Sequence, residues 1–227
     1  MSGGVDSSVT AHILKEQGYQ VEAVFMRNWD TLDERGTCPS TRDWHDVQAV
    51  CKQLDIRCHE INLVKEYWNA VFSHALDEYA RGRTPNPDIL CNKEIKFGVL
   101  LDHIARRLGA FHRSLFPLGL LDKKRDVRRL AIAAGLATAD KEESMGICFV
   151  GERRRFDEFL AEYLPQHAGD ILSDNGKIIG KHKGMFTKTI GQSAGISGWQ
   201  DKWYIYAKDV ASNCMYAVQS RYVHSHF

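Results

Sequence analysis

The sequence predicts an α/β protein with a parallel sheet covered by helices, followed by a small β-rich module. In the first half of the chain, segments with the apolar spacing of helices alternate with short strand-like segments, and this alternation is typical of parallel sheets. Beyond Pro165 the chain becomes rich in glycine and in short strand-like segments. We therefore expect two domains, over residues 1–167 and 168–227.

Apolar spacing places the elements of the first half. Helices are predicted over residues 8–17, 41–54, 65–81 and 92–108, and strands over 19–26 and 56–63. Gly18 is a usual residue for ending the first helix. The last of these helices carries its apolar residues on one face, namely Phe97, Leu100, Ile104 and Leu108.

A second group of elements follows residue 111. Asp122 can cap a helix over residues 123–134 that Gly135 ends, and its buried side is formed by Val127, Leu130, Ala131 and Ala134. A further helix is predicted over 152–164. Strands are predicted over 178–180, 185–190, 203–208 and 214–219, the last two as a hairpin.

Composition excludes several classes of protein. The 227 residues are 44% hydrophobic with a net charge of +1, and no apolar run approaches the roughly 18 residues of a membrane span. We expect a monomer without a membrane partner. The opening MSGGVDSSVT resembles neither a secretory signal nor a transit peptide, although an organelle address could precede it.

Basic residues gather in clusters. They lie at 123–129, at 153–155, and at Lys177, Lys181, Lys183 and Lys188. One cluster alone is as well explained by solvated surface. Several together fit a nucleic-acid backbone better, because each neutralised phosphate releases counterions.

The six cysteines are scattered and form no CxxC pair, which argues against a structural zinc site and against a disulfide scaffold. Cys51 shares a helical stripe with Trp44, Val47 and Leu54, so we interpret it as a core residue. In a reducing compartment, a cysteine in a polar loop is a candidate reagent.

The segment SGGVDSS leads directly into the first helix. Glycines allow close approach of the backbone, and successive N–H groups at a helix N-terminus form an anion cradle. No lysine follows the glycines, so this is not the loop of enzymes that cleave the γ-phosphate. The phosphate-binding residues predicted here are Ser2, Gly3, Gly4, Val5, Asp6, Ser7 and Ser8, and Asp6 could hold Mg²⁺ on the phosphates.

The segment NPDILCNKEIKF contains the first candidate thiol. Its prolines argue against a regular helix before Cys91, so Cys91 should begin the following helix, where the dipole favours a thiolate. Lys93 and Lys96 add positive charge, and Asp88 lies three residues earlier. The second thiol, Cys148, lies in the apolar stretch GICFVG and by itself would read as a buried strand residue.

The SGGVDSS loop resembles the PP-loop of the ATP pyrophosphatase family, which adenylates a carbonyl oxygen of its substrate. That resemblance implies a Rossmann-like fold and ATP as cosubstrate with Mg²⁺. It also implies that Met26 lies near the adenine, although Met26 is equally well explained as a core residue.

The segments SGGVDSSV, NPDILCNKEIKF, SLFPLG, KEESMGICFVGER, GKHKG and TIGQ together are similar to the tRNA 2-thiouridylases. The resemblance implies thiolation of the wobble uridine of tRNAs for Lys, Glu and Gln. It also implies that a persulfide on Cys148, loaded by a sulfur-relay donor protein, would supply the sulfur, and that Cys91 would then form a transient disulfide with Cys148. Asn86, Pro87 and Asp88 would contact the target base, with Asp88 as proton acceptor. Lys93, Lys96, Arg153 and Lys183 would contact tRNA.

The wording KEESMGICFVG is closest to the mitochondrial branch, so we expect a mitochondrial location, with a cytoplasmic one as the alternative. With two poised cysteines we expect no iron–sulfur cluster.

The sequence departs from the family pattern in four places. A hydrophobic strand before the loop, the segments that should follow Gly109-Ala110, and the C-terminal β-barrel are absent, and Ser193 stands where arginine usually follows TIGQ. We expect a truncated chain with an internal deletion near 110/111. Two alternatives stay open: a PP-loop ligase or amidotransferase-type enzyme, which needs no cysteine pair, or an RNA-binding remnant without catalysis.

Overall fold

The computed structural model describes residues 1–30, 38–108, 117–119, 121–142 and 156–220. Contacts group the chain into two compact units, Met1–Val71 with Asp88–Arg153 and Phe72–Pro87 with Arg154–Phe227. Each unit is therefore built from two separate stretches of sequence. The expected domain boundary between residues 167 and 168 stays a prediction, because these units do not divide the chain at a single point.

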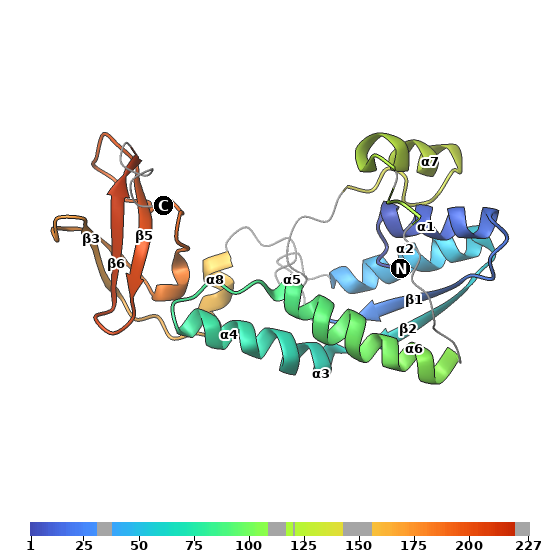
Figure 1. Cartoon of the computed structure of the whole chain (residues 1–227), viewed down its shortest axis with the longest axis horizontal. Coiled ribbons are helices and arrows are strands. Elements are labelled where there is room, and N and C mark those ends of the chain that lie inside the picture. Colours follow the sequence, from blue (N-terminus) through green and yellow to red (C-terminus); the bar gives the residue numbers. More distant parts are fainter. Residues whose placement is uncertain (31–37, 109–116, 120, 143–155, 221–227) are drawn as a thin grey trace. The chain divides into compact units, whose positions relative to one another are not determined.

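The first unit holds a parallel pair of strands with helices around it (Figure 1). Its elements are α1 (Val5–Glu16), β1 (Glu22–Arg27), α2 (Pro39–Leu54), β2 (Arg57–Asn62), α3 (Val64–Tyr67), η2 (Cys91–Val99), α6 (Leu100–Leu108), η3 (Lys123–Val127) and α7 (Arg128–Ala133). Helix η1 (Trp68–Phe72) ends at the junction with the second unit, and α5 (Pro87–Leu90) begins at the other junction.

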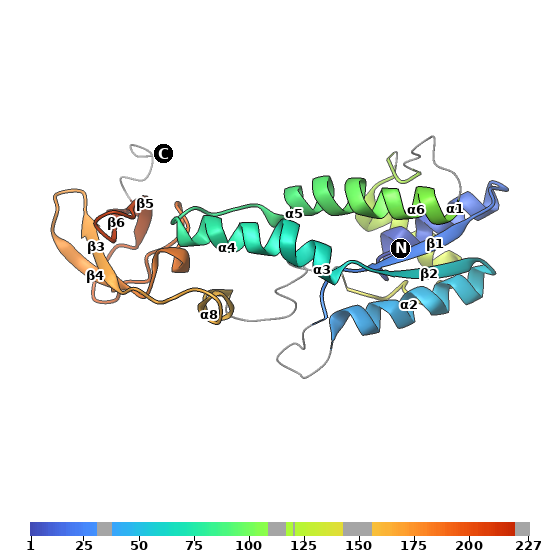
Figure 2. The same ribbon diagram turned by 90° about the horizontal axis from the view of Figure 1, so that it is seen from below.

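The strands β1 and β2 run parallel, from Glu22 opposite Arg57 to Arg27 opposite Asn62. This confirms the predicted parallel pairing. Figures 1 and 2 show α2 on one face of the pair and the continuous helix of α5, η2 and α6 on the other. The α2 face is the better packed, because Phe25 of β1 lies against Val47 and Cys51 of α2. Cys51 is 1% exposed, which confirms its interpretation as a core residue.

A second layer joins α1 to the helix formed by η3 and α7. Val5 and Val9 of α1 pack against Val127 and Ala131. The predicted cap is present, since Asp122 Oδ1 accepts a hydrogen bond from the backbone N–H of Arg125 at 3.0 Å. The chain then leaves the helix through Gly135 at φ +59°, the left-handed conformation that favours glycine.

The described part of the second unit holds a four-stranded sheet, two α-helices and one 3₁₀ turn. Its elements are α4 (Ser73–Ala80), α8 (Phe156–Ala161), β3 (Gly169–Ser173), β4 (Ile178–His182), η4 (Met185–Thr187), β5 (Trp203–Asp209) and β6 (Cys214–Gln219). The strand order is β4-β3-β6-β5, and the predicted hairpin of β5 and β6 is confirmed by their antiparallel pairing. Ile171, Ile205 and Met215 form the centre of its core. The rings of Phe72, Phe159 and Tyr163 join the two helical segments to each other.

Three expectations about elements are wrong. Residues 185–190 contain the 3₁₀ turn η4, not a strand, because Thr187 Oγ1 donates to the carbonyl of Gly184 and closes the turn. Strand β3 was not predicted, although it pairs with both β4 and β6. Finally, the helix that carries Cys91 begins at Pro87 rather than at residue 92, since proline is tolerated in the first helical turn.

Among the described residues, no helix is both long enough and apolar enough to cross a bilayer.

Candidate functional site

The glycine loop forms the N-terminal end of α1, as the sequence predicts. Gly4 is the residue before the helix, and the Ser7 and Ser8 hydroxyls donate to its carbonyl at 3.0 Å each. The backbone N–H of Ser2 donates to Ser7 Oγ at 3.2 Å. Serine hydroxyls and the first N–H groups of a 12-residue helix thus gather in one turn, which suits an anion.

Gly3 is the residue that this loop most requires. Its φ is +78°, and a Cβ at Gly3 would lie 2.8 Å from the carbonyl oxygen of Asp43. The loop is therefore pressed against the first turns of α2. No other amino acid allows both the left-handed backbone and this approach.

Asp43 also connects the loop to the segment that leads toward Cys148. Lys141 Nζ donates to Asp43 Oδ1 at 2.7 Å and to Asp46 Oδ2. Burial alone would lower the pKa of Lys141, but the hydrogen bonds that Lys141 donates to the two carboxylates, together with their charges, outweigh it and raise the pKa. Lys141 is thus held as a cation at neutral pH, at the point where the KEESMGICFVG segment begins.

Three further contacts fix the stretch before Lys141. Thr138, which is 1% exposed, donates from Oγ1 to Ser8 Oγ of the glycine loop at 2.9 Å. Gln53 donates to the carbonyls of Ala134 and Gly135 and accepts from the N–H of Ala137. Arg128 donates to the carbonyl of Lys141 at 3.0 Å. The chain that approaches Cys148 is therefore anchored to both α1 and α2.

The sequence reasoning did not assign roles to Lys141, Asp43, Asp46, Gln53 or Thr138. One local pattern could have indicated a cation site: Asp43 and Asp46 lie three residues apart, so both carboxylates share one face of α2. Nothing in the sequence alone, however, brings that face to Lys141.

The NPDILC segment lies at the start of the α5–η2–α6 helix. Pro87 is buried, whereas Asn86 and Asp88 are exposed. A wide π-helical stretch, Cys91–Val99, follows within the same helix. Such stretches are rare and often occur at functional sites.

Cys91 does not lie where the sequence predicts. It stands one turn inside the helix and is 2% exposed, so it lacks the predicted place at the helix N-terminus. The expected lysines have other partners, since Lys93 pairs with Glu94 at 2.8 Å and Lys96 donates to Asn92 at 2.9 Å. The error came from treating Pro87 as a helix breaker.

Cys148 and Arg153 lie outside the described residues, so their predicted roles stay predictions. Met26 is half-buried on β1 opposite Ile61, and Lys183 is exposed after β4.

The buried Cys51 is a poor candidate reagent, because burial and the neighbouring Cys58 raise its pKa to about 11. Among the described residues, no group of three His, Cys, Asp or Glu side chains could hold a metal ion.

The first unit thus combines a glycine loop that suits an anion, an anchored stretch that ends at Lys141, and a buried Cys91. Comparison with known proteins identifies the family to which this unit belongs. The model for the tRNA methyl transferase HUP domain matches residues 1–112 and 108–152, and the model for the tRNA methyl transferase PRC-barrel domain matches residues 157–219. The tRNA-specific 2-thiouridylases MnmA of Staphylococcus aureus strains JH9 and Newman are each 44% identical over 263 aligned residues, which cover 96% of this chain and 70% of the relative.

The chain belongs to the tRNA-specific 2-thiouridylase family.

Family membership confirms the predicted fold class, a Rossmann-like HUP domain followed by a small β-rich domain. It also identifies the chain with a family of tRNA sulfurtransferases. The aligned length of 263 exceeds the 227 residues of this chain. The relatives therefore have residues inside the matched stretch to which this chain has no counterpart.

Proposed function

We propose that this chain catalyses the ATP-dependent 2-thiolation of the wobble uridine of tRNA. The observation that carries the proposal is a pair of contacts made by Asp43. Its backbone lies against Gly3 of the glycine loop, and its carboxylate accepts a hydrogen bond from Lys141, where the segment that contains Cys148 begins; all three residues belong to one compact unit. Nucleotide activation and sulfur delivery need such proximity, because adenylation takes place on the oxygen, and sulfur attack on the carbon, of the same C2 carbonyl group.

The loop fits the phosphates of ATP. Gly3 lets the loop lie against α2, Ser2 and Ser7 place hydroxyls at the turn, and α1 directs its first N–H groups there. ATP would adenylate the C2 oxygen of the uracil and release pyrophosphate. A poor leaving group thereby becomes AMP.

The two cysteines complete the reaction. The terminal sulfur of a Cys148 persulfide attacks C2, the C–O bond breaks and AMP leaves with its electron pair. The Cys91 thiolate then attacks Cys148 Sγ, so the S–S bond to the uridine breaks and 2-thiouridine leaves. The Cys91–Cys148 disulfide that results needs an external thiol reductant, and a donor protein reloads the persulfide.

Burial of Cys91 constrains this scheme. A thiol that is 2% exposed reaches a partner only through a local opening of its helix or through a partner placed beside it. The π-helical stretch that begins at Cys91 provides a weaker backbone ladder at that point. The exposed Asn86 and Asp88 precede it and remain the proposed contacts with the base.

Incubation of the protein with ATP, a small-molecule persulfide donor and unmodified tRNA tests the proposal. We expect tRNA-dependent release of AMP and a product that is retarded in a gel containing mercury, which binds thiouridine. Formation of AMP without thiolated tRNA would favour a PP-loop ligase or amidotransferase-type enzyme.

One observation favours a second candidate, an RNA-binding form that has lost catalysis. The HUP model matches in two stretches that meet at residues 108–112, and the relatives have additional residues within the aligned region. The helix before this point is poorly covered: Phe97 is 64% exposed, and Leu100 and Ile104 are only half-buried. An internal deletion that removed neighbouring strands would leave such a face open. This candidate predicts tRNA binding with steep salt dependence and no release of AMP.

A further inference from the structure

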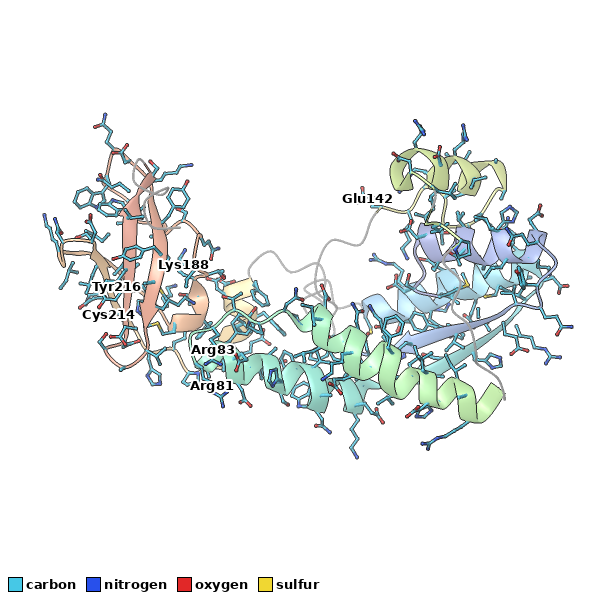
Figure 3. All side chains as sticks on the ribbon, viewed as in Figure 1. Arg81, Arg83, Glu142, Lys188, Cys214 and Tyr216 are labelled. Atoms are coloured by element: carbon cyan, nitrogen blue, oxygen red, sulfur yellow. The ribbon has the colours of Figure 1, made fainter. Side chains whose placement is uncertain are left out.

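The second unit contains a pocket of about 470 Å³ that none of the steps above uses. Its lining includes Arg81, Arg83, Thr84, Thr189 and Lys208. The volume is within the range of sites for small ligands or single nucleotides. Figure 3 shows the two arginines together at the end of α4.

The pocket wall is held in place by the turn that follows α4. Gly82 has a φ of +73°, and a Cβ there would lie 2.9 Å from Val210 Cγ2 at the end of β5. Lys208 Nζ donates to the carbonyls of Gly82 at 3.0 Å and of Met185 at 2.8 Å. The turn that carries both arginines is therefore connected to β5 and η4 by these hydrogen bonds and by the close approach of Gly82 to Val210.

The opposite wall comes from the TIGQ motif, to which no role was assigned above. The N–H of Gly191 donates to the carbonyl of Ile205 at 2.7 Å, which fixes this loop on β5. Thr84 Oγ1 donates to Thr189 Oγ1 at 3.2 Å across the pocket. Because each hydroxyl has one proton, that of Thr189 is left to donate to a ligand.

The charge of the pocket is positive. Arg81 and Arg83 share one carboxylate, that of Glu78, at 3.2 Å each. These arginines hold the pKa of Glu78 below its ordinary value. Each arginine uses only Nη1 for this contact, and a guanidinium has five N–H donors. Glu78 thus positions two guanidinium groups whose remaining donors suit the oxygens of a phosphate.

We propose that this pocket binds a phosphate of the tRNA backbone beside the target uridine, through Arg81, Arg83 and Thr189. The inference rests on the proposed function, which supplies tRNA as the substrate. Its position along the chain supports it, because Arg83 and Thr84 directly precede the segment from Asn86 to Asp88. The phosphates of free ATP carry the same chemistry, so the experiment separates the two sources.

The test compares two double variants of the whole chain. Arg81→Gln with Arg83→Gln removes both charges and keeps a donor for Glu78. Arg57→Gln with Arg106→Gln is the matched control, because these arginines are also exposed but lie outside the basic clusters of the sequence. The probes are an unmodified anticodon stem-loop RNA and, separately, ATP.

We expect the pocket variant to bind the stem-loop about tenfold more weakly than the wild type. The slope of log affinity against log salt should become shallower by about 0.7 for each lost contact with single-stranded RNA. The control should change stem-loop affinity less than about twofold, and ATP affinity should stay the same in both variants.

Three results would overturn the inference. An equal loss in the control would show a general effect of net charge, and a loss of ATP affinity in the pocket variant would assign the pocket to the nucleotide. If the pocket variant binds the stem-loop as tightly as the wild type does, the inference about the pocket is wrong, and the proposed function is unaffected. Absence of stem-loop binding by the wild type would instead remove the proposed function together with the inference.

Discussion

Replacement of Gly3 by alanine should destabilise the first unit and weaken ATP binding. A left-handed backbone at φ +78° costs an alanine about 1–2 kcal/mol. The added Cβ would also lie 2.8 Å from the Asp43 carbonyl oxygen and 3.0 Å from Asp43 Cα. Because these are backbone atoms that cannot rotate away, α2 must shift, at a further cost of about 1–3 kcal/mol. The sum is a loss of about 2–5 kcal/mol.

Gly18 offers the matched control. Its φ is +83°, but an alanine Cβ there would have nothing within 4 Å. Gly18→Ala should therefore cost only the left-handed term of about 1–2 kcal/mol. Urea unfolding gives the two free energies, and calorimetric titration gives the ATP affinities. Equal destabilisation by the two variants, or unchanged ATP affinity in Gly3→Ala, would refute the close approach of the loop to α2.

Two further outcomes follow from the ion pair and from the buried lysine. Lys141→Met should lower the free energy of unfolding by about 1–3 kcal/mol, because Asp43 and Asp46 lose their shared cation. Urea unfolding measures this change. A loss below about 0.5 kcal/mol would contradict the anchoring role of Lys141. Burial lowers the pKa of Lys208 from 10.5 to about 8, so between these pH values the unfolded chain binds more protons and stability should rise with pH. Thermal unfolding of the wild type and Lys208→Met across this range checks the sign, and a parallel pH dependence of the two proteins would contradict it.

Local signals predicted much of the fold. The helix after Asp122 and its end at Gly135 were predictable because an N-cap and a left-handed glycine act within a few residues of sequence. Cys51 was predictable as core from helical spacing. The β5–β6 hairpin followed from two adjacent alternating segments.

One failure has a local cause and the other a tertiary cause. Pro87 can begin a helix because the N–H groups of the first helical turn have no acceptor within the helix, so a proline there loses no hydrogen bond. This places Cys91 one turn deeper than expected and buries it. Phe97 lies on an apolar face by spacing and yet is 64% exposed, because packing depends on a neighbour that spacing cannot reveal.

The candidate site was predicted in part. The glycine loop was recognisable from its residues, and the structure gives Gly3 the close contact that such a loop requires. The anchoring by Asp43, Asp46 and Lys141 joins residues about a hundred positions apart, as does the hydrogen bond between Ser8 and Thr138. Contacts at this separation leave no local pattern in a single sequence.

The central claim is that adenylation and sulfur transfer are separable steps, with the thiols of Cys91 and Cys148 needed only for the second. The most direct measurement follows pyrophosphate release and 2-thiouridine formation together in Cys91→Ser and Cys148→Ser, with Cys58→Ser as the control. We expect both variants to release pyrophosphate in the presence of tRNA and to form no thiouridine, while the control does both. Thiouridine produced by either variant would contradict the role given to that cysteine.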